Sequence, residues 1–396
     1  MKRLIEFDAL RGILLLMMIV NHSPSALRRL TDQPLGFFTT AECFVFVSAF
    51  LAGMLFRKRS EKLGFEVARS SALRRTLRIY WVHVATIAFT FILGSFFLTD
   101  LPGIRNLLDH FLLNPWPAIL ASLALLFRPP LMDILPIYIL FSFLTPAAFY
   151  ASQRWGWKPV LVLSFSTWLI AQTHFREMIL EDLKGFSFIQ LGPFDLFAWQ
   201  FLWIGGLFIG QRSLENKPFL PHFLRPLFFL TAIAFLLWRW GSIARGTDPQ
   251  TWLLDKWHLG PIRLINFAVT ASVIAVFLKH LNRWENLLRP VSLIGRHMLT
   301  VFGCEICLSV VLLGRTESGL TAEPLTTALV VIQLLTAPLL AWFLEGQRGA
   351  RQPAPPIPQP SVTRPRVPSA GPGLPQNLNT SRPARPQVLQ PLSSTR

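Results

Sequence analysis

Charged residues are scarce in this sequence. Only 15% of the 396 residues are charged, whereas 52% are hydrophobic, and the mean hydropathy is +0.44. A soluble protein of this length would carry more charge, so the composition excludes an ordinary soluble domain and predicts an all-α, polytopic membrane protein. The 13 Trp and 34 Phe fit a lipid-facing surface with aromatic residues at the membrane interfaces.

Acidic residues are the scarcer of the two charge classes. The chain has 21 Asp and Glu against 38 Lys and Arg, a formal net charge of +17. We attribute the excess to the positive charge that orients membrane helices, together with a basic tail. A nucleic-acid partner is not expected, because no motif interleaves these charges with base-stacking aromatic residues on a soluble surface.

Cysteine is also scarce, and several catalytic motifs are absent. Cys43, Cys304 and Cys307 all lie in apolar stretches, which indicates no disulfide framework. Cys304 and Cys307 form C-x-x-C, but without a second pair or a His partner they are interpreted as small buried side chains. The sequence has no P-loop, G-x-S-x-G or H-E-x-x-H motif, which argues against a nucleotide hydrolase or a zinc protease.

Long apolar runs are what the sequence has in place of charge. They predict about ten membrane spans. The stretch 100–130 is broken by prolines, and its apolar piece 118–127 is too short to cross, so it is predicted to be interfacial or re-entrant. The predicted spans are 7–23, 35–56, 79–99, 131–150, 158–172, 194–210, 225–243, 261–280, 291–314 and 324–344.

The loop charges predict the orientation and the domain limits. A strongly basic loop at 57–78 is placed in the cytoplasm by the positive-inside rule, which makes both termini cytoplasmic. Residues 1–346 form the predicted membrane domain. Residues 347–396 are rich in Pro and Arg and contain no acidic or aromatic residue, so they are predicted to be a disordered cytoplasmic tail.

The first predicted span carries two ionisable residues, Arg11 and His22. Eleven residues are close to three helical turns, so both side chains project from one stripe, roughly 16 Å apart along the axis. Such groups within a membrane are costly and are functional candidates by default. His22 has a side chain suited to accepting and returning a proton near neutral pH. Glu42, in the second span, is a candidate partner of Arg11.

Three functional classes remain open on these residues alone. A membrane-embedded transferase and a transporter or flippase for a glycan or lipid precursor both fit, and a non-catalytic scaffold is the third. The polar residues crowd the first two spans, which favours a fixed reaction chamber over a transport path.

The opening segment DALRGILLLMMIVNH (Asp8–His22) resembles that of the OpgC family, which is related to the acyltransferase-3 superfamily. That superfamily's recurring feature is Arg or Lys followed by ten residues and His, as at Arg11 and His22. The resemblance covers about residues 4–345. Six further stretches match in order: QPLGF (Gln33–Phe37), AECFVFVSAFLAG (Ala41–Gly53), MDILPIYI (Met132–Ile139), AWQFLWIGG (Ala198–Gly206), KWHLGPIRLINF (Lys256–Phe267) and GRHMLTVF (Gly295–Phe302).

The resemblance implies an acyltransferase of the bacterial inner membrane. It would move an acyl group, typically succinyl, from cytoplasmic acyl-CoA to hydroxyls of a periplasmic glucan, with acyl-CoA as co-substrate and no permanently bound cofactor. Two positions depart from the family pattern: Ala49 stands in place of Gly, and Met298 in place of Ser. Neither departure is expected to touch Arg11 or His22.

The resemblance also implies roles for individual residues. His22 would deprotonate the sugar hydroxyl, Arg11 would bind donor phosphate or stabilise negative charge, and Glu42 would orient one of them. In substrate binding, Asp133 is implied as a second orienting group. The nucleotide of the donor would be bound by Arg74, Arg75 and Arg78, and the sugar by Trp199, Gln200 and Trp257.

Overall fold

The computed structural model describes residues 4–23, 25–97, 102–182, 189–215, 220–247, 249, 251–278, 285–316 and 323–350. Within these residues the secondary structure is helical, and a single isolated bridge joins Phe127 to Gln190. This confirms the predicted all-α class. One compact unit covers Met1–Arg351. Most of the predicted tail, from residue 351 on, lies outside the described residues.

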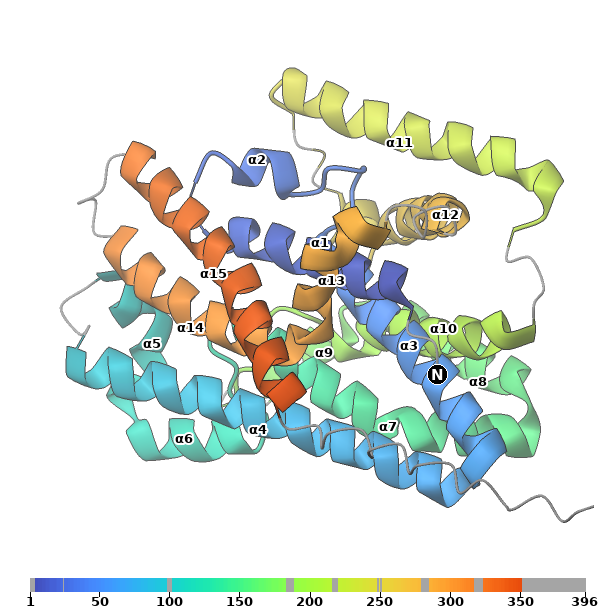
Figure 1. Cartoon of the computed structure of the whole chain (residues 1–396), viewed down its shortest axis with the longest axis horizontal. Coiled ribbons are helices and arrows are strands. Elements are labelled where there is room, and N and C mark those ends of the chain that lie inside the picture. Colours follow the sequence, from blue (N-terminus) through green and yellow to red (C-terminus); the bar gives the residue numbers. More distant parts are fainter. Residues whose placement is uncertain are drawn as a thin grey trace, which may run out of the picture. The chain divides into compact units, whose positions relative to one another are not determined.

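The helices follow one another along the chain as Figure 1 labels them. Short 3-10 turns lie at Ser213–Glu215, His222–Leu224 and Trp252–Leu254. The α-helices are α1 (Ile5–Asn21), α2 (Arg28–Thr31), α3 (Thr40–Leu63), α4 (Phe65–Phe97), α5 (Pro102–Leu113), α6 (Pro115–Leu123), α7 (Ile134–Trp155), α8 (Trp157–Ala171), α9 (Phe175–Asp182), α10 (Leu196–Arg212), α11 (Arg225–Ala244), α12 (Pro261–Leu278), α13 (Glu285–Arg296), α14 (Met298–Thr316) and α15 (Glu323–Ala350).

Each predicted span contains a helix, but fewer of them are long enough to cross a bilayer. Among the described residues, six helical segments qualify by length and composition, in α3, α4, α7, α11, α12 and α15. A seventh exists if α13 and α14, which meet at a 73° bend, form one broken span. The predicted spans that contain α1, α8 and α10 fall short of this measure, because these helices have only 17, 15 and 17 residues, at or below the lower end of the roughly 17–25 residues that can cross a bilayer.

Two connections differ in form from the sequence-based expectation. The basic stretch 57–78 is helical rather than a loop, since α3 runs to Leu63 and α4 starts at Phe65. The chain turns at Gly64, whose φ of +88° is a conformation that favours glycine. The stretch 100–130 forms two short helices, α5 and α6, too short to span a bilayer.

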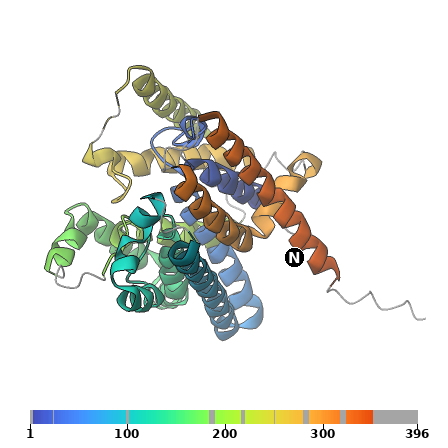
Figure 2. The ribbon, with the colours of Figure 1, turned by 90° about the vertical axis from the view of Figure 1, so that its left-hand side faces the viewer.

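Close backbone approach holds the central helices together. A Cβ on Gly295 of α13 would lie 1.7 Å from the carbonyl oxygen of Asp8 in α1, and one on Gly12 would lie 2.1 Å from that of Val291. α10 packs on α3 in the same way through Gly206 and Gly210. α1 is surrounded by α3, α13, α14 and α15 (Figures 1 and 2), so its polar side chains face the interior of the bundle.

Candidate functional site

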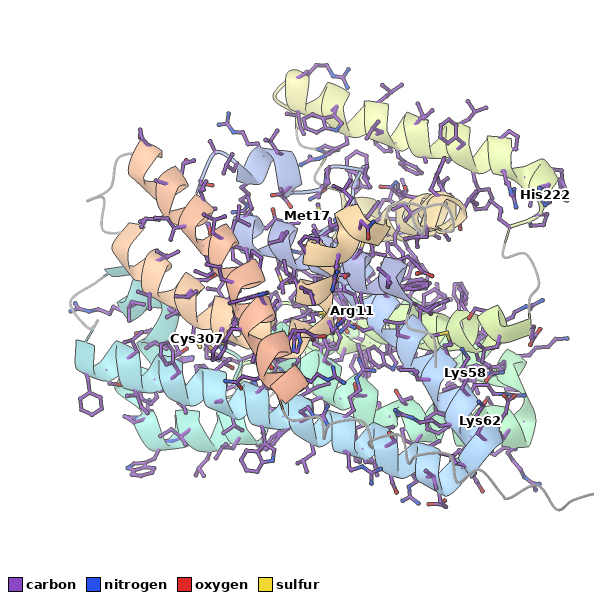
Figure 3. The ribbon with its side chains drawn as sticks, viewed as in Figure 1. Arg11, Met17, Lys58, Lys62, His222 and Cys307 are labelled. Atoms are coloured by element: carbon purple, nitrogen blue, oxygen red, sulfur yellow. The ribbon has the colours of Figure 1, made fainter. Side chains whose placement is uncertain are left out.

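Arg11 lies in the middle of α1, among the surrounding helices (Figure 3). Its Nε donates a hydrogen bond to the sulfur of Met298 at 3.1 Å, and its Nη1 lies 3.8 Å from a carboxylate oxygen of Asp8. The bend between α13 and α14 brings Met298 to this position. The expectation that Met298 would not touch Arg11 was therefore wrong, and the substitution relative to the family pattern changes the surroundings of Arg11 directly.

One of the three arginines predicted to bind the donor faces the interior. Arg75 lines a small pocket of about 50 Å³ between α3, α4 and α7, together with Arg59, whose Nη1 donates to the hydroxyl of Ser71. Arg74 and Arg78 are exposed on α4. The charge of Arg75 interacts with that of Arg11, so the two guanidinium groups belong to one electropositive region.

Buried hydroxyl groups lie on the helices that enclose this region. Ser48 of α3 and Tyr138 and Ser142 of α7 are buried. The hydroxyls of Ser48 and Tyr138 interact with each other, and that of Ser142 has no hydrogen-bond partner among the described residues. Tyr138 interacts electrostatically with both Arg11 and Arg75. Buried polar atoms in native proteins are normally paired. The hydroxyl of Ser142 is therefore suited to a polar ligand that enters beside Arg75.

His22 lies at the C-terminal end of α1, as its cap. Its backbone N–H donates to the carbonyl of Met18 at 3.0 Å, and its side chain is half-buried. The charges of Lys256 and Arg28 act on it. The structure thus places Arg11 and His22 at different depths of one helix, as the spacing predicted, with about 16 Å between them along the axis.

Lys256, whose charge acts on His22, is a site residue that sequence reasoning missed. Its ammonium lies 4.7 Å from the ring centre of Trp257 and 5.8 Å from that of Phe194. Burial lowers the pKa of Lys256, and the charge of Glu42 opposes this. Asp32 and Asp133 also act on its charge. The signal was present, because Lys256 opens the KWHLGPIRLINF stretch.

Glu42 makes structural contacts that join two helices. One oxygen forms a buried ion pair with Nε of Arg263 in α12. The other accepts hydrogen bonds from the backbone N–H of Thr39 at 3.0 Å and from its hydroxyl at 2.5 Å, as part of a capping box for α3. These contacts join α3 to α12, and they engage the carboxylate in place of the predicted contact with Arg11 or His22. Arg263 is a second residue that sequence reasoning missed.

The remaining predicted substrate contacts fall into two groups. Trp199 is fully buried and donates from Nε1 to the carbonyl of Trp257 at 3.0 Å, and Gln200 binds Ser164 through both its oxygen and its nitrogen. These two side chains hold helices together and offer no open face to a sugar. Trp257 is 37% exposed and retains such a face.

Asp133 precedes α7 without forming a side-chain cap. Asp133 is half-buried, and its carboxylate interacts with the charges of Lys256 and Arg128. Asp133 thus belongs to the same group of charges as Lys256, on the side of the molecule where α1 ends at His22.

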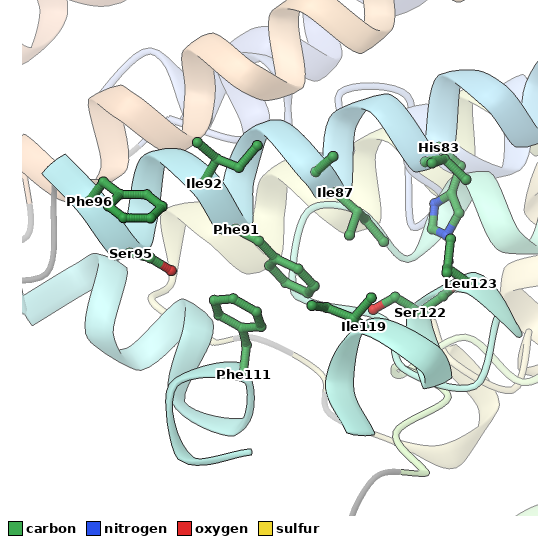
Figure 4. A pocket seen from close by; sticks show the side chains of 12 residues that line it. His83, Ile87, Phe91, Ile92, Ser95, Phe96, Phe111, Ile119, Ser122 and Leu123 are labelled. Carbon is green, nitrogen blue, oxygen red and sulfur yellow. The ribbon is translucent and has the colours of Figure 1, made fainter. Parts of the chain in front are cut away.

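The larger of the two best-defined pockets lies elsewhere. It has a volume of about 290 Å³ and an almost wholly apolar lining between α4, α5 and α6, with His83 and Ser122 at one end (Figure 4). It includes none of the predicted site residues. We therefore place the candidate site along α1, where the ionisable and buried polar groups gather, and not in this pocket.

Comparison with known proteins bears on the family. No curated protein and no solved structure matches the chain. The family model described as OpgC protein matches residues 3–348, which takes in the helices from α1 to nearly the end of α15. This confirms the resemblance carried by the ordered motifs. The chain belongs to the OpgC family.

Proposed function

We propose that the protein is a membrane-embedded O-acyltransferase that modifies a periplasmic glucan. The donor is acyl-CoA, with succinyl as the first acyl group to test, and the acceptor is a sugar hydroxyl. Membership of the OpgC family supports glucan modification. The observation that carries the proposal is the separation of two polar groups along α1, with Arg11 and Arg75 beside its middle and His22 and Lys256 at its C-terminal end.

The groups around Arg11 and around His22 suit the donor and the acceptor respectively. Arg11 and Arg75, with the buried hydroxyl of Tyr138 in their field, offer the positive charge and donors that phosphate or the polar arm of CoA would bind. The predicted orientation turns this group toward the cytoplasm, where acyl-CoA is found. In the same orientation, the C-terminal end of α1 at His22 lies toward the opposite side of the membrane. The exposed ring of Trp257 lies on that side too, and a sugar can stack on it.

His22 is the proposed general base. Its imidazole accepts the proton of the sugar hydroxyl while the hydroxyl oxygen attacks the thioester carbonyl carbon. The C–S bond then breaks, the acyl group stays on the sugar oxygen, and the CoA thiolate takes up the proton held by His22. Lys256 is placed to stabilise the negative charge that develops on the carbonyl oxygen. Arg11, at the other depth of α1, binds the donor rather than the reacting carbonyl.

The test is acyl transfer from acyl-CoA to glucan oligosaccharides by the purified full chain. His22→Ala should lower the rate by about 10²–10⁴-fold, the usual contribution of a general base. His222→Ala is the matched control, since His222 is exposed at the start of α11 (Figure 3) and should leave the rate unchanged. Full activity of His22→Ala would disprove the mechanism. Glycan flux in liposomes without any acyl transfer would favour a transporter instead.

A further inference from the structure

Four side chains from separate parts of the chain converge beside the segment that precedes α12. His174 lies in the turn between α8 and α9, Glu177 in α9, Asp195 at the start of α10 and His258 just before α12. Oε2 of Glu177 lies 3.3 Å from Nε2 of His258 and 4.0 Å from Nδ1 of His174. Oδ2 of Asp195 lies 3.9 Å from the same Nε2 of His258.

Oδ2 of Asp195 is buried and has no hydrogen-bond partner among the described residues. Oε2 of Glu177 and Nε2 of His258 are also buried, and they pair with each other at 3.3 Å. Asp195 carries the argument, because its side chain is 0% exposed. Its Oδ1 caps α10 by accepting from the backbone N–H of Phe197 at 2.6 Å, which leaves Oδ2 directed at His258. An unpaired buried oxygen of this kind is costly, and here it lies 3.9 Å from Nε2 of His258, beside the pair of His258 and Glu177.

We propose that this cluster binds a zinc ion through His174, Glu177, His258 and Asp195. Zinc takes imidazole nitrogen and carboxylate oxygen at about 2.0–2.2 Å in tetrahedral sites. Neighbouring ligand atoms of such a site are about 3.4 Å apart. One ligand atom each from His174, Glu177 and His258 lies within 4.8 Å of the other two, and Asp195, with Oδ2 3.9 Å from Nε2 of His258, would turn toward them as the fourth ligand. Imidazole ligands favour zinc over magnesium or calcium, which prefer oxygen.

The surroundings also match a zinc site. Nδ1 of His258 is hydrogen-bonded to the carboxylate of Asp255, the arrangement that fixes a ligating histidine with its other nitrogen toward the metal. Arg176 lies beside the cluster, with Nε 4.0 Å from the other oxygen of Glu177. The carboxylates of Glu177, Asp195 and Asp255 carry three negative charges and Arg176 one positive charge. A divalent cation would therefore bring this group to neutrality.

The proposed ion would fix the loop that presents Trp257. Asp195 already binds this loop through its backbone N–H, which donates to the carbonyl of Trp257 at 3.1 Å. Gln172 of α8 donates to the carbonyl of His258 at 2.7 Å. A metal bridging α9, α10 and the loop would complete this attachment. The inference goes beyond the proposed acyl transfer and does not depend on it.

The experiment measures zinc binding by the full chain, purified in detergent without a polyhistidine tag and stripped with a chelator. Zinc is added, and the bound metal is measured by elemental analysis alongside the shift in thermal unfolding. We expect one zinc per chain and a Tm that rises with zinc concentration. His174→Ala and Glu177→Gln should weaken binding more than tenfold. Both side chains are more than 40% exposed, so neither change threatens folding.

Two further variants separate a built site from adventitious binding. Asp255→Asn removes the charge of the partner of His258, a carboxylate that also accepts from the backbone N–H groups of Trp257 and His258, and should weaken zinc binding by about 10–100-fold. His222→Ala removes an exposed histidine remote from the cluster and should bind zinc as the unaltered chain does. The proposal is wrong if the unaltered chain neither retains zinc nor gains stability from it. It is equally wrong if His174→Ala and Glu177→Gln bind zinc like His222→Ala.

Discussion

The direction of a side chain decides what neighbouring arginines on α4 can do. Arg75 lines an interior pocket and interacts with Arg11, whereas Arg74 is exposed. If Arg75 binds the donor, Arg75→Ala should raise the KM for acyl-CoA by about 10–100-fold, because a hydrogen bond to a charged group contributes about 1.5–3 kcal/mol. Arg74→Ala, one position away, should change KM little. Steady-state kinetics on both variants make the comparison, and equal effects would show that only general positive charge matters.

Breaking the ion pair between Glu42 and Arg263 tests whether Glu42, which the sequence placed in the active site, has a structural role. Both side chains are almost fully buried, with exposed fractions of 1% and 3%. Arg263→Ala would leave an unpaired buried carboxylate and should destabilise the protein by about 3–5 kcal/mol. Denaturant unfolding in detergent measures the loss. Combining it with Glu42→Gln should recover part of the stability, whereas purely additive losses would contradict the pairing.

At the residue scale, the sequence predicted a helix that carries Arg11 and ends near His22, and α1 confirms this helix, while the roles of the two side chains stay predictions. Arg11 and His22 follow each other on α1 with the spacing that helical geometry requires. The contact of Arg11 with Met298 joins positions 287 residues apart and depends on the bend between α13 and α14. The partner of Glu42, Arg263, is 221 residues away. Local periodicity carries no information on such pairings, so both were missed.

The packing of whole helices depends on a few glycines. In α10, a Cβ on Gly210 would lie 2.0 Å from the carbonyl oxygen of Phe50 in α3, whereas one on Gly205 would meet nothing within 4 Å. Gly210→Ala should force α3 and α10 apart and cost about 1–3 kcal/mol. Gly205→Ala in the same helix should stabilise the protein by about 0.5–1 kcal/mol through helix propensity. Thermal unfolding of the two variants should therefore shift in opposite directions.

Element existence was predicted better than element length. Each apolar run contains a helix, because burial and lipid contact both demand one. The basic stretch 57–78 was interpreted as a loop, since its charges interrupt the apolar pattern. It is helical because charged residues at helix ends can extend into water while the backbone continues its hydrogen bonding, and only Gly64 breaks it. Hydropathy identifies where a chain meets lipid, not where a helix stops.

The orientation of the whole molecule can be tested with single cysteines. After Cys43, Cys304 and Cys307 are replaced by Ser, Lys62→Cys reports on the end of α3 and Trp252→Cys on the segment before α12. Both native side chains are exposed. With cytoplasmic termini, a membrane-impermeant maleimide should label Trp252→Cys in cells with a permeabilised outer membrane, and Lys62→Cys only after lysis. The reverse pattern would invert the topology and the assignment of donor and acceptor ends.

The arrangement of α11 has a consequence for how the sequence can vary. Within this helix only Arg239 and Ser242 are buried, and its attachment includes the contact of Trp238 with Phe37 and the hydrogen bond from Trp240 to the carbonyl of Pro34. Figure 1 shows it at the edge of the bundle, where it crosses α12. In a random mutant library, exchanges among apolar residues at Leu227, Leu230 and Leu237 should survive freely. Substitutions of Trp238, Arg239 or Trp240 should be depleted. The sequence of α11 would then vary on its outer face and stay constant where the helix is attached.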